Sequence, residues 1–138
     1  MKKKEPVSHI MTSHVYAVHH DDTLANVVDI FRKHKIRHLP VLKGKAIAGI
    51  ISSTDTDRLT FGALFEREDS TDQAILEMLT IPHVMTSKMT TVSPDTSIKE
   101  VAEIFASAHF HALPVVEGEK LKGIVTTTDV IKYMLEQY

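Results

Sequence analysis

Gly49-Ile50-Ile51-Ser52-Ser53-Thr54-Asp55 returns 74 residues later as Gly123-Ile124-Val125-Thr126-Thr127-Thr128-Asp129. The same offset aligns residues 7–59 with residues 81–133 without a gap. It also places two further strings on their counterparts: His9-Ile10-Met11-Thr12-Ser13 on His83-Val84-Met85-Thr86-Ser87, and Leu39-Pro40-Val41 on Leu113-Pro114-Val115. A repeat of this length indicates two copies of one supersecondary unit.

Each copy carries the same sequence of periodic patterns. Apolar residues at helical spacing follow Thr23 and Ser97, which are suitable N-cap residues. Two strand-like runs then flank a glycine turn, at residues 39–42 and 46–51 and again at 113–116 and 121–125. We also expect an opening strand at residues 15–18 and 89–92, and a second helix after each hairpin. The order is strand, helix, strand, strand, helix.

This order predicts an α/β (α+β) fold class, with two tandem β-α-β-β-α repeats packed with pseudo-twofold symmetry. We expect the first repeat to span residues 1–65, a helical linker to span 66–80, and the second repeat to span 81–138. The linker expectation comes from Ser70-Thr71-Asp72-Gln73, which has capping-box form ahead of an apolar run. A half of this size buries too little surface to be stable alone, so we expect the two copies to fold together.

The composition excludes several classes of function. A hydrophobic content of 43% supports a real core, and a net charge of −2 argues against a protein that coats nucleic acid. No cysteine is present, which excludes disulfides, thiolate metal sites and cysteine nucleophiles. The basic start lacks a following apolar segment, and no stretch approaches the roughly 20 apolar residues of a membrane span. We therefore expect a cytoplasmic protein without nucleic acid partners or membrane insertion.

The chemistry of each copy is concentrated at the end of its last strand. A hydroxyl residue, Ser52 or Thr126, lies where the strand gives way to a helix, and free backbone N–H groups there favour a phosphate. Three positions on, Asp55 or Asp129 is suited to accept hydrogen bonds from both hydroxyls of a ribose. The preceding glycine permits close approach to the backbone. This corner favours a ribose phosphate ligand.

The same pairs of residues also fit a simpler role. Ser52 with Asp55, and Thr126 with Asp129, have the spacing of a capping box that only starts a helix. Two features favour the ligand interpretation: a cap has no need of the glycine, and the whole set recurs in both copies. Both interpretations stay open at this point.

Together these marks resemble the paired CBS domain, or Bateman module, named for cystathionine beta-synthase. The resemblance covers nearly the whole chain and rests on Met11-Thr12 and Met85-Thr86, on the Leu-Pro-Val strands, and on the Gly-x-x-Ser/Thr-x-x-Asp endings. It implies a regulatory module that binds an adenosine-containing ligand, such as AMP, ADP, ATP or S-adenosylmethionine, in clefts between the repeats. It implies no other cofactor, although Mg²⁺ could accompany a nucleotide.

The resemblance also implies a set of ligand-binding residues. It assigns Ser52 and Thr126 to phosphate or ribose oxygens and Asp55 and Asp129 to the ribose diol. It places the adenine and the phosphates against a further set: Tyr16, Ala17, Thr90, Thr91, Pro40 and Pro114 for the adenine, and Arg37, His38 and His111 for the phosphates. The second copy has Ala112 in place of His38, and Asp57 adds a negative charge near the first corner. The sequence therefore does not decide which of the two clefts holds the ligand.

Nine histidines raise the question of a metal. The groups His19-His20-Asp21-Asp22, His34 with His38, and His109-x-His111 each contain residues that suit zinc or nickel. None shows three or four convergent ligands by spacing alone, so we interpret them as surface or partly buried histidines and assign no metal-binding residue. The basic run of residues 32–38 is either a solvated helix end or a rim that attracts phosphate.

Three functions can be compared from the sequence. The first is a regulatory module that signals to a partner protein when a nucleotide binds. The second is an enzyme, and we expect none, because no nucleophile with an activating base and no acid pair can be assembled, so no catalytic residue is assigned. The third is a structural dimerisation module without a ligand. Apolar second helices favour a homodimer in either non-enzymatic case.

Overall fold

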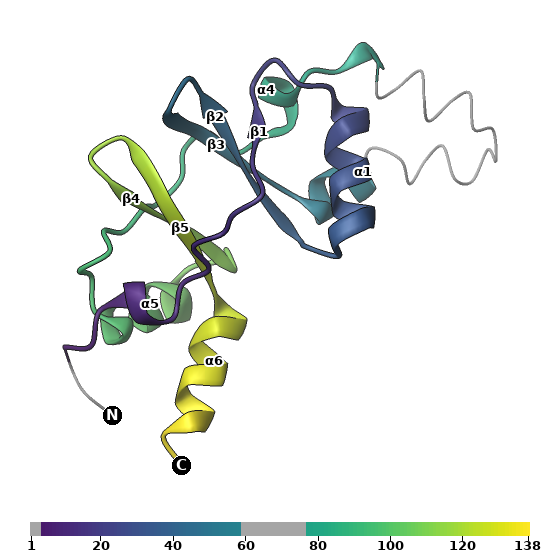
Figure 1. The fold of residues 1–138 in the computed structure, drawn as a ribbon. Helices are drawn as coiled ribbons and strands as arrows, with labels where there is room; N and C mark the ends of the chain where they lie inside the picture. The colour runs from purple at the N-terminus through teal and green to yellow at the C-terminus, as the bar shows by residue number, and fades with distance from the viewer. Residues whose placement is uncertain (1–3, 59–76) are drawn as a thin grey trace. The chain divides into compact units, whose positions relative to one another are not determined.

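The computed structural model describes residues 4–58 and 77–138, which form two compact units. The first unit contains residues 16–89, and the second contains residues 90–138 together with residues 1–15. Figure 1 shows the two units with their elements coloured along the chain.

The first unit holds a small mixed sheet with one long helix. Its elements are β1 (Val18–His19), α1 (Leu24–His34), β2 (His38–Lys43), β3 (Ala46–Ser52) and α4 (Ile81–Val84). Strand β1 pairs parallel to β2, and β2 pairs antiparallel to β3 with a register shift between Val41 and Leu42. Residues 53–58 are helical directly after β3. The chain therefore moves from a strand into a helix at the predicted corner.

The second unit repeats this plan. Its elements are the short 3-10 helix η1 (Val7–His9), α5 (Ile98–Ser107), β4 (Ala112–Glu117), β5 (Lys120–Thr126) and α6 (Thr127–Glu136). Strands β4 and β5 are antiparallel, with a register shift between Val115 and Val116 that matches the shift in the first hairpin. The mixed α/β class and the hairpin positions predicted from the sequence are confirmed, with each strand longer by one or two residues.

The helix starts follow from their cap residues. The Thr23 hydroxyl accepts a hydrogen bond of 3.1 Å from the Asn26 amide at the start of α1, and Ser97 accepts one of 3.1 Å from Glu100 at the start of α5. Helix α1 ends where Lys35 adopts a left-handed conformation with φ 52°. The predicted N-caps and the predicted end near Lys35 are both confirmed.

The opening segment of each repeat contributes to the core of the other repeat's unit. Val7, near the start of the first repeat, is fully buried in the core of the second unit, and Ile81, its equivalent at offset 74, is buried in the core of the first. Backbone bridges accompany the exchange: Thr12 pairs with Ile124 and Thr86 pairs with Ile50. Compact units and sequence repeats therefore have different boundaries.

Close packing at Gly49 and Gly123, in the middle of β3 and β5, makes the exchange possible. A Cβ atom on Gly123 would lie 2.6 Å from the Thr12 carbonyl oxygen and 2.8 Å from the sulfur of Met11. Gly49 has the same relation, at 2.8 Å and 2.7 Å, to Thr86 and Met85. Only glycine fits at these positions without displacing the backbone opposite.

The predicted opening strands are wrong in extent. Strand β1 begins at Val18 and has two residues, and in the second copy a single parallel bridge joins Val92 to Val115. The reason is that the chain passes from one unit to the other at residues 15–16 and 89–90, within the predicted strands. Residues before each crossing pair with a strand of one unit, and residues after it pair with a strand of the other unit.

Two sequence expectations fall outside the described residues. These are the second helix of the first repeat at Leu59, Ala63 and Leu64, and residues 66–76 of the helical linker expected over residues 66–80. Among the helices that the structure does describe, none combines the length and the apolar character needed to cross a membrane.

Candidate functional site

The corner after β3 is held by two reciprocal hydrogen bonds. The Ser52 amide donates to Oδ2 of Asp55 at 3.0 Å, and the Asp55 amide donates to the Ser52 hydroxyl oxygen at 3.2 Å. Both residues are half-buried. Strand β3 ends at Ser52, where the helix begins, and the first helical turn places Asp55 within hydrogen-bond distance of Ser52.

The corner after β5 has the same geometry. The Thr126 amide donates to Oδ2 of Asp129 at 2.9 Å, and the Asp129 amide donates to the Thr126 hydroxyl oxygen at 3.1 Å. These bonds form a complete capping box at the start of α6. The capping interpretation of both corners is therefore confirmed.

The caps do not use the whole of either carboxylate. Within residues 4–58 and 77–138, the hydrogen bonds to Asp55 and Asp129 end on Oδ2. The second oxygen, Oδ1, is left for a further donor on a half-buried side chain. A carboxylate can serve the cap and a hydroxyl ligand together, so the two roles are compatible.

The glycine of the motif has a structural explanation that the sequence reasoning missed. Gly49 and Gly123 make room for Met85 and Met11 of the opening segments, rather than for a small molecule. The signal was present in the sequence, because the Met-Thr pair recurs at the same offset as the glycine. One of the two features that favoured a ligand over a cap therefore loses its force.

Backbone hydrogen bonds connect the predicted phosphate residues to the corners. The Arg37 carbonyl oxygen accepts from the Ser53 amide at 2.8 Å, and the His111 carbonyl oxygen accepts from the Thr127 amide at 3.0 Å. Arg37 and His111 are exposed. In each unit, the backbone of the basic residue is therefore hydrogen-bonded to the residue that follows the hydroxyl residue of the motif.

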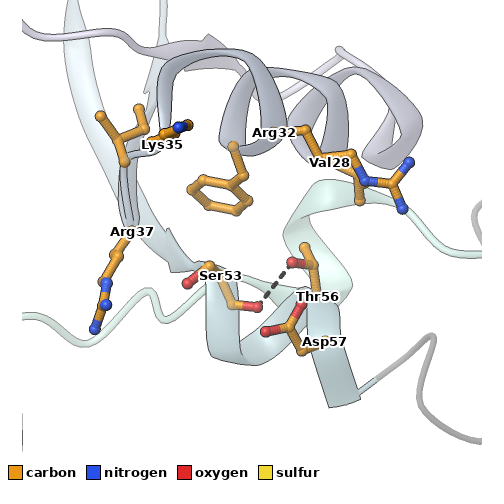
Figure 2. Close-up of a pocket in the computed structure, with 9 residues that line it drawn as sticks. Val28, Arg32, Lys35, Arg37, Ser53, Thr56 and Asp57 are labelled. Atoms are coloured by element: carbon orange, nitrogen blue, oxygen red, sulfur yellow. Dashed lines mark hydrogen bonds between the residues drawn. The ribbon is translucent and has the colours of Figure 1, made fainter.

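A pocket of about 320 Å³ lies in the first unit between the end of α1 and the helical residues after β3 (Figure 2). Arg32, Lys35 and Arg37 contribute three positive charges, and Asp57 contributes one negative charge. The remaining lining residues are Val28, Phe31, Ile36, Ser53 and Thr56. The pocket shares Arg37 with the predicted set but does not include Ser52 or Asp55, and its charge favours an anion.

The residues predicted around the adenine are placed differently in the two units. Tyr16 is 48% exposed, and its ring stacks on His34 at a centroid distance of 3.9 Å, a contact that the sequence did not indicate. Ala17 is half-buried, while Thr90 and Thr91 are exposed. The first unit thus presents an aromatic pair where the second presents two hydroxyls.

The prolines and His38 lie in the strands. Pro40 and Pro114 are buried inside β2 and β4, and His38, at the first position of β2, is half-buried. The Pro114 carbonyl oxygen accepts a hydrogen bond of 3.1 Å from the Val92 amide. Both prolines therefore support the sheet, and their rings have little surface available to a ligand.

Known proteins share both the sequence pattern and the fold. A family model described as the CBS domain matches residues 7–57 and 81–136. The A-adding tRNA nucleotidyltransferase of Geobacter sulfurreducens is 26% identical over 125 residues, which make up 91% of this chain and 13% of that enzyme. Protein MJ1225 of Methanocaldococcus jannaschii is 28% identical over 133 residues, or 95% of this chain and 48% of that protein. The chain thus spans half or less of these two relatives.

Two solved structures extend the comparison. The crystal structure of MJ1225 superposes with a TM-score of 0.82 and 27% identity over 97% of this chain and 49% of that one. The CBS domain pair of protein MJ0100, solved with 5′-methylthioadenosine and S-adenosyl-L-methionine, superposes with a TM-score of 0.74 and 25% identity over 94% of this chain and 98% of that one. The match to a complete domain pair covers both repeats.

Proposed function

The chain belongs to the CBS domain family, as a tandem pair of CBS domains, and from that premise we propose that it is a regulatory module that binds an adenosine-containing ligand. The observation that carries the proposal is the duplicated corner, where a hydroxyl, a carboxylate oxygen and an exposed basic residue lie within a few positions of one another in each unit.

The similarity to the MJ0100 domain pair supports the choice of ligand class. That protein was solved with two adenosine compounds, one with a charged amino acid group and one without. The adenosine portion is common to both, so it is the part we carry over to this chain. AMP, ADP, ATP and S-adenosylmethionine are the ligands to be tested.

The first unit offers more to a phosphate than the second does. Arg37 is accompanied there by Arg32 and Lys35 at the pocket beside the corner, whereas the second unit has His111. Asp57 opposes these cations, but three positive charges outnumber it. We therefore propose that a nucleotide with phosphate binds in the first unit and that the corner of the second unit selects for a nucleoside.

Regulation requires that ligand binding reaches a partner. We propose a homodimer, supported by exposed apolar side chains on α6 at helical spacing: Ile131 is 55% exposed and Leu135 is 66% exposed. A ligand shifts such an assembly only by its difference in affinity between two states. The output would pass to a separate regulated protein in the cytoplasm, without catalysis by the module itself.

A second candidate function is a dimerisation module without a ligand. Two observations favour it: both aspartates act as helix caps, and the motif glycines accommodate the opening segments. In this case the corners are only structural, and the exposed face of α6 carries the function. The two candidates differ in whether the Asp side chains matter to anything beyond stability.

Calorimetric titration with AMP, ATP and S-adenosylmethionine tests the proposal. We expect binding to the wild-type chain, and weaker binding by at least about tenfold when Asp55 or Asp129 is replaced by Ala, because a charge-assisted hydrogen bond contributes about 1.5 to 3 kcal/mol. The variant that loses more affinity identifies the occupied unit. Binding of ligand at a hundredfold excess over Kd should add about 2.7 kcal/mol to the unfolding free energy.

Thr23→Ala is the matched control, because it removes the N-cap of α1 without touching either corner. It should lower stability as the Asp variants do and leave nucleotide affinity unchanged. If no adenosine compound binds, or if Thr23→Ala weakens binding as much as Asp55→Ala does, the dimerisation module becomes the better account. Turnover of a nucleotide by the purified chain would contradict the non-enzymatic part of the proposal.

A further inference from the structure

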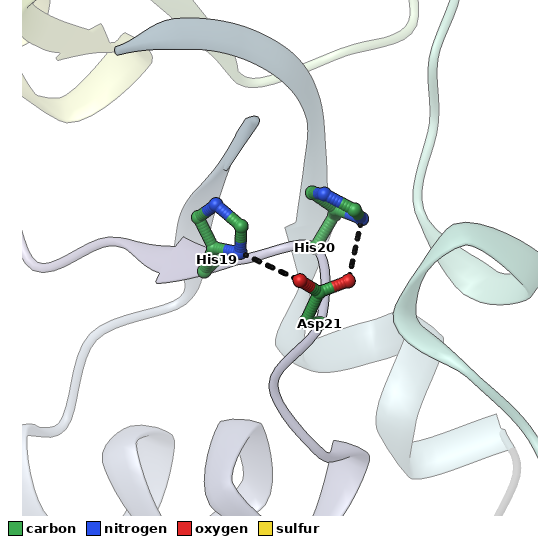
Figure 3. Close-up of side chains that lie close together, drawn as sticks. All are labelled: His19, His20 and Asp21. Atoms are coloured by element: carbon green, nitrogen blue, oxygen red, sulfur yellow. Dashed lines mark ion pairs between the residues drawn. The ribbon is translucent and has the colours of Figure 1, made fainter. Parts of the chain in front are cut away.

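Two histidines and an aspartate converge in the first unit at the turn that follows β1. Figure 3 shows the rings of His19 and His20 on either side of the Asp21 carboxylate. Nδ1 of His20 lies 3.0 Å from Oδ1 of Asp21, and Nδ1 of His19 lies 3.5 Å from Oδ2. One ligand atom from each of the three residues lies within 4.8 Å of the others.

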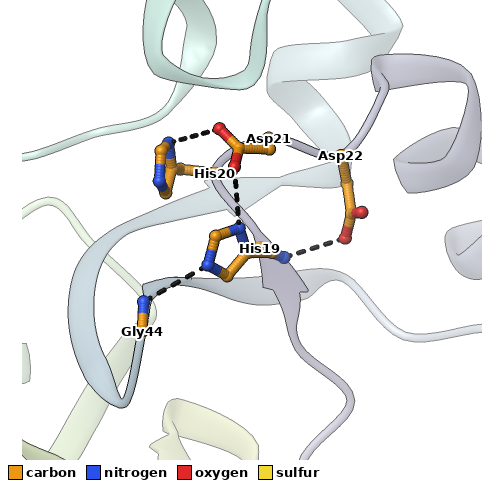
Figure 4. A network of polar contacts seen from close by, with 5 residues as sticks. All are labelled: His19, His20, Asp21, Asp22 and Gly44. Carbon is orange, nitrogen blue, oxygen red and sulfur yellow. Dashed lines mark hydrogen bonds and ion pairs between the residues drawn. The ribbon is translucent and has the colours of Figure 1, made fainter.

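The backbone holds this turn in place independently of the rings. The His19 amide donates to Oδ2 of Asp22 at 2.9 Å (Figure 4). The Asp22 amide donates to the His19 carbonyl oxygen at 2.9 Å. The His20 amide donates to the Leu42 carbonyl oxygen on the neighbouring strand at 2.9 Å. A turn fixed in this way presents its side chains with little further loss of conformational freedom.

The second repeat forms the same turn without any histidine. Ser93 and Thr96 stand at the positions of His19 and Asp22, and the Ser93 amide donates to the Thr96 hydroxyl oxygen at 3.0 Å. Asp95 is the counterpart of Asp21. The turn itself therefore forms without imidazole. In the first repeat the His19 ring also accepts a hydrogen bond from the Gly44 amide, at 3.2 Å.

We propose that His19, His20 and Asp21 bind a divalent transition-metal ion of the zinc class, with the fourth position open to water. Imidazole and carboxylate together suit this class of ion. Bond lengths of about 2.0 to 2.2 Å in a tetrahedral site put neighbouring ligand atoms about 3.4 Å apart. The three ligand atoms here lie within 4.8 Å of one another, so small side-chain rotations bring them to that spacing. Both carboxylates of the turn, Asp21 and Asp22, add negative charge that attracts the ion.

Gly44 links the metal to the hairpin. Its amide donates to Nε2 of His19 at 3.2 Å, so the neutral ring carries its proton on Nδ1, facing Asp21. An ion at Nδ1 needs that lone pair, so the ring proton moves through solvent to Nε2, and the hydrogen bond from Gly44 is lost. Metal binding thus shifts the His19 ring proton from Nδ1 to Nε2 and frees the Gly44 amide at the tip of the β2–β3 turn.

The test is calorimetric titration of the full chain with Zn²⁺ alone, after removal of any affinity tag, treatment with a chelator, and in the absence of nucleotide. We expect one ion per chain. His20→Ala and Asp21→Asn should each raise Kd at least about tenfold, because each removes a ligand. Asp95→Asn and His109→Ala are the matched controls, since they remove the equivalent acid of the second repeat and an exposed histidine elsewhere. Neither should change Kd.

The Gly44 amide provides a second reading by nuclear magnetic resonance. Its signal should move when Zn²⁺ is added to the wild-type chain and stay in place when Zn²⁺ is added to His20→Ala. The proposal is overturned if Zn²⁺ does not bind, if the cluster variants bind as the wild type does, if a control variant loses the ion, or if Zn²⁺ binds while the Gly44 signal is unchanged.

Discussion

Asp129 and Thr126 bond to each other twice, each through its own side chain and the other's backbone amide, at 2.9 Å and 3.1 Å. The same double contact joins Asp55 to Ser52. Each pair satisfies backbone donors that a helix start would otherwise leave to water. The corners therefore have a stability role that any ligand role must coexist with.

Replacing Thr126 by Ala should lower the unfolding free energy by about 1 kcal/mol, because the amide of Asp129 loses its acceptor. Thr126→Ser keeps a hydroxyl at the same place and should recover most of that loss. Urea denaturation followed by circular dichroism measures both. Equal stability of the wild type and the Ala variant would mean that the cap contributes nothing in solution.

Replacing Gly123 by Ala should cost about 1 to 3 kcal/mol, since the new Cβ would stand 2.6 Å from the Thr12 carbonyl oxygen and force the opening segment away. Gly118→Asn is a useful comparison, because this glycine has φ +63° with open space around it and Asn tolerates that conformation. We expect a change below about 1 kcal/mol there. Thermal unfolding of both variants checks the contrast.

The offset of 74 residues predicted the hairpins, the long helices and their caps, because turn glycines, cap residues and apolar spacing are local signals. It could not predict where the opening segments pack. Residues 15–18 look like one strand, yet a division between the two units falls between Val15 and Tyr16. Which of two similar cores receives Val7 depends on contacts between residues far apart in the sequence.

For the same reason, the sequence predicted the contacts of the site that lie within one turn but not those that join separate elements. The bond between Asp55 and Ser52 follows from spacing within one turn, so the capping alternative was visible in the sequence. The stack of Tyr16 on His34 and the grouping of Arg32 with Ser53 at one pocket join separate elements. Neither could be read from local patterns, and the cluster at His19 depends on ring orientations that spacing does not fix.

Lys35→Gly should raise the unfolding free energy by about 1 kcal/mol, because Lys35 pays a steric cost at φ 52° that Gly does not. Lys33→Gly, in the last turn of α1, should lower it by about the same amount. The two substitutions remove the same charge and have opposite expected signs. Chemical denaturation of the pair tests this, and a shared sign would show that helix propensity alone decides both.

Ile131→Glu combined with Leu135→Glu should abolish self-association while leaving the fold intact, because both side chains are already exposed on α6. Sedimentation velocity at several protein concentrations reports the change. Lys132→Glu, an exposed α6 residue next to Ile131, is the control for added negative charge. A wild-type chain that sediments as a monomer throughout would remove the basis for the dimer.

The exchange of Val7 and Ile81 means that neither repeat can be cut out as a self-contained piece. A fragment that ends before Ile81 lacks a side chain that fills its own interior, and a fragment that starts after Val7 has the same defect. Such fragments should recover ordered structure only when they are mixed, because each then supplies the buried side chain that the core of the other lacks. For this chain, the smallest unit that can fold independently is the pair of repeats.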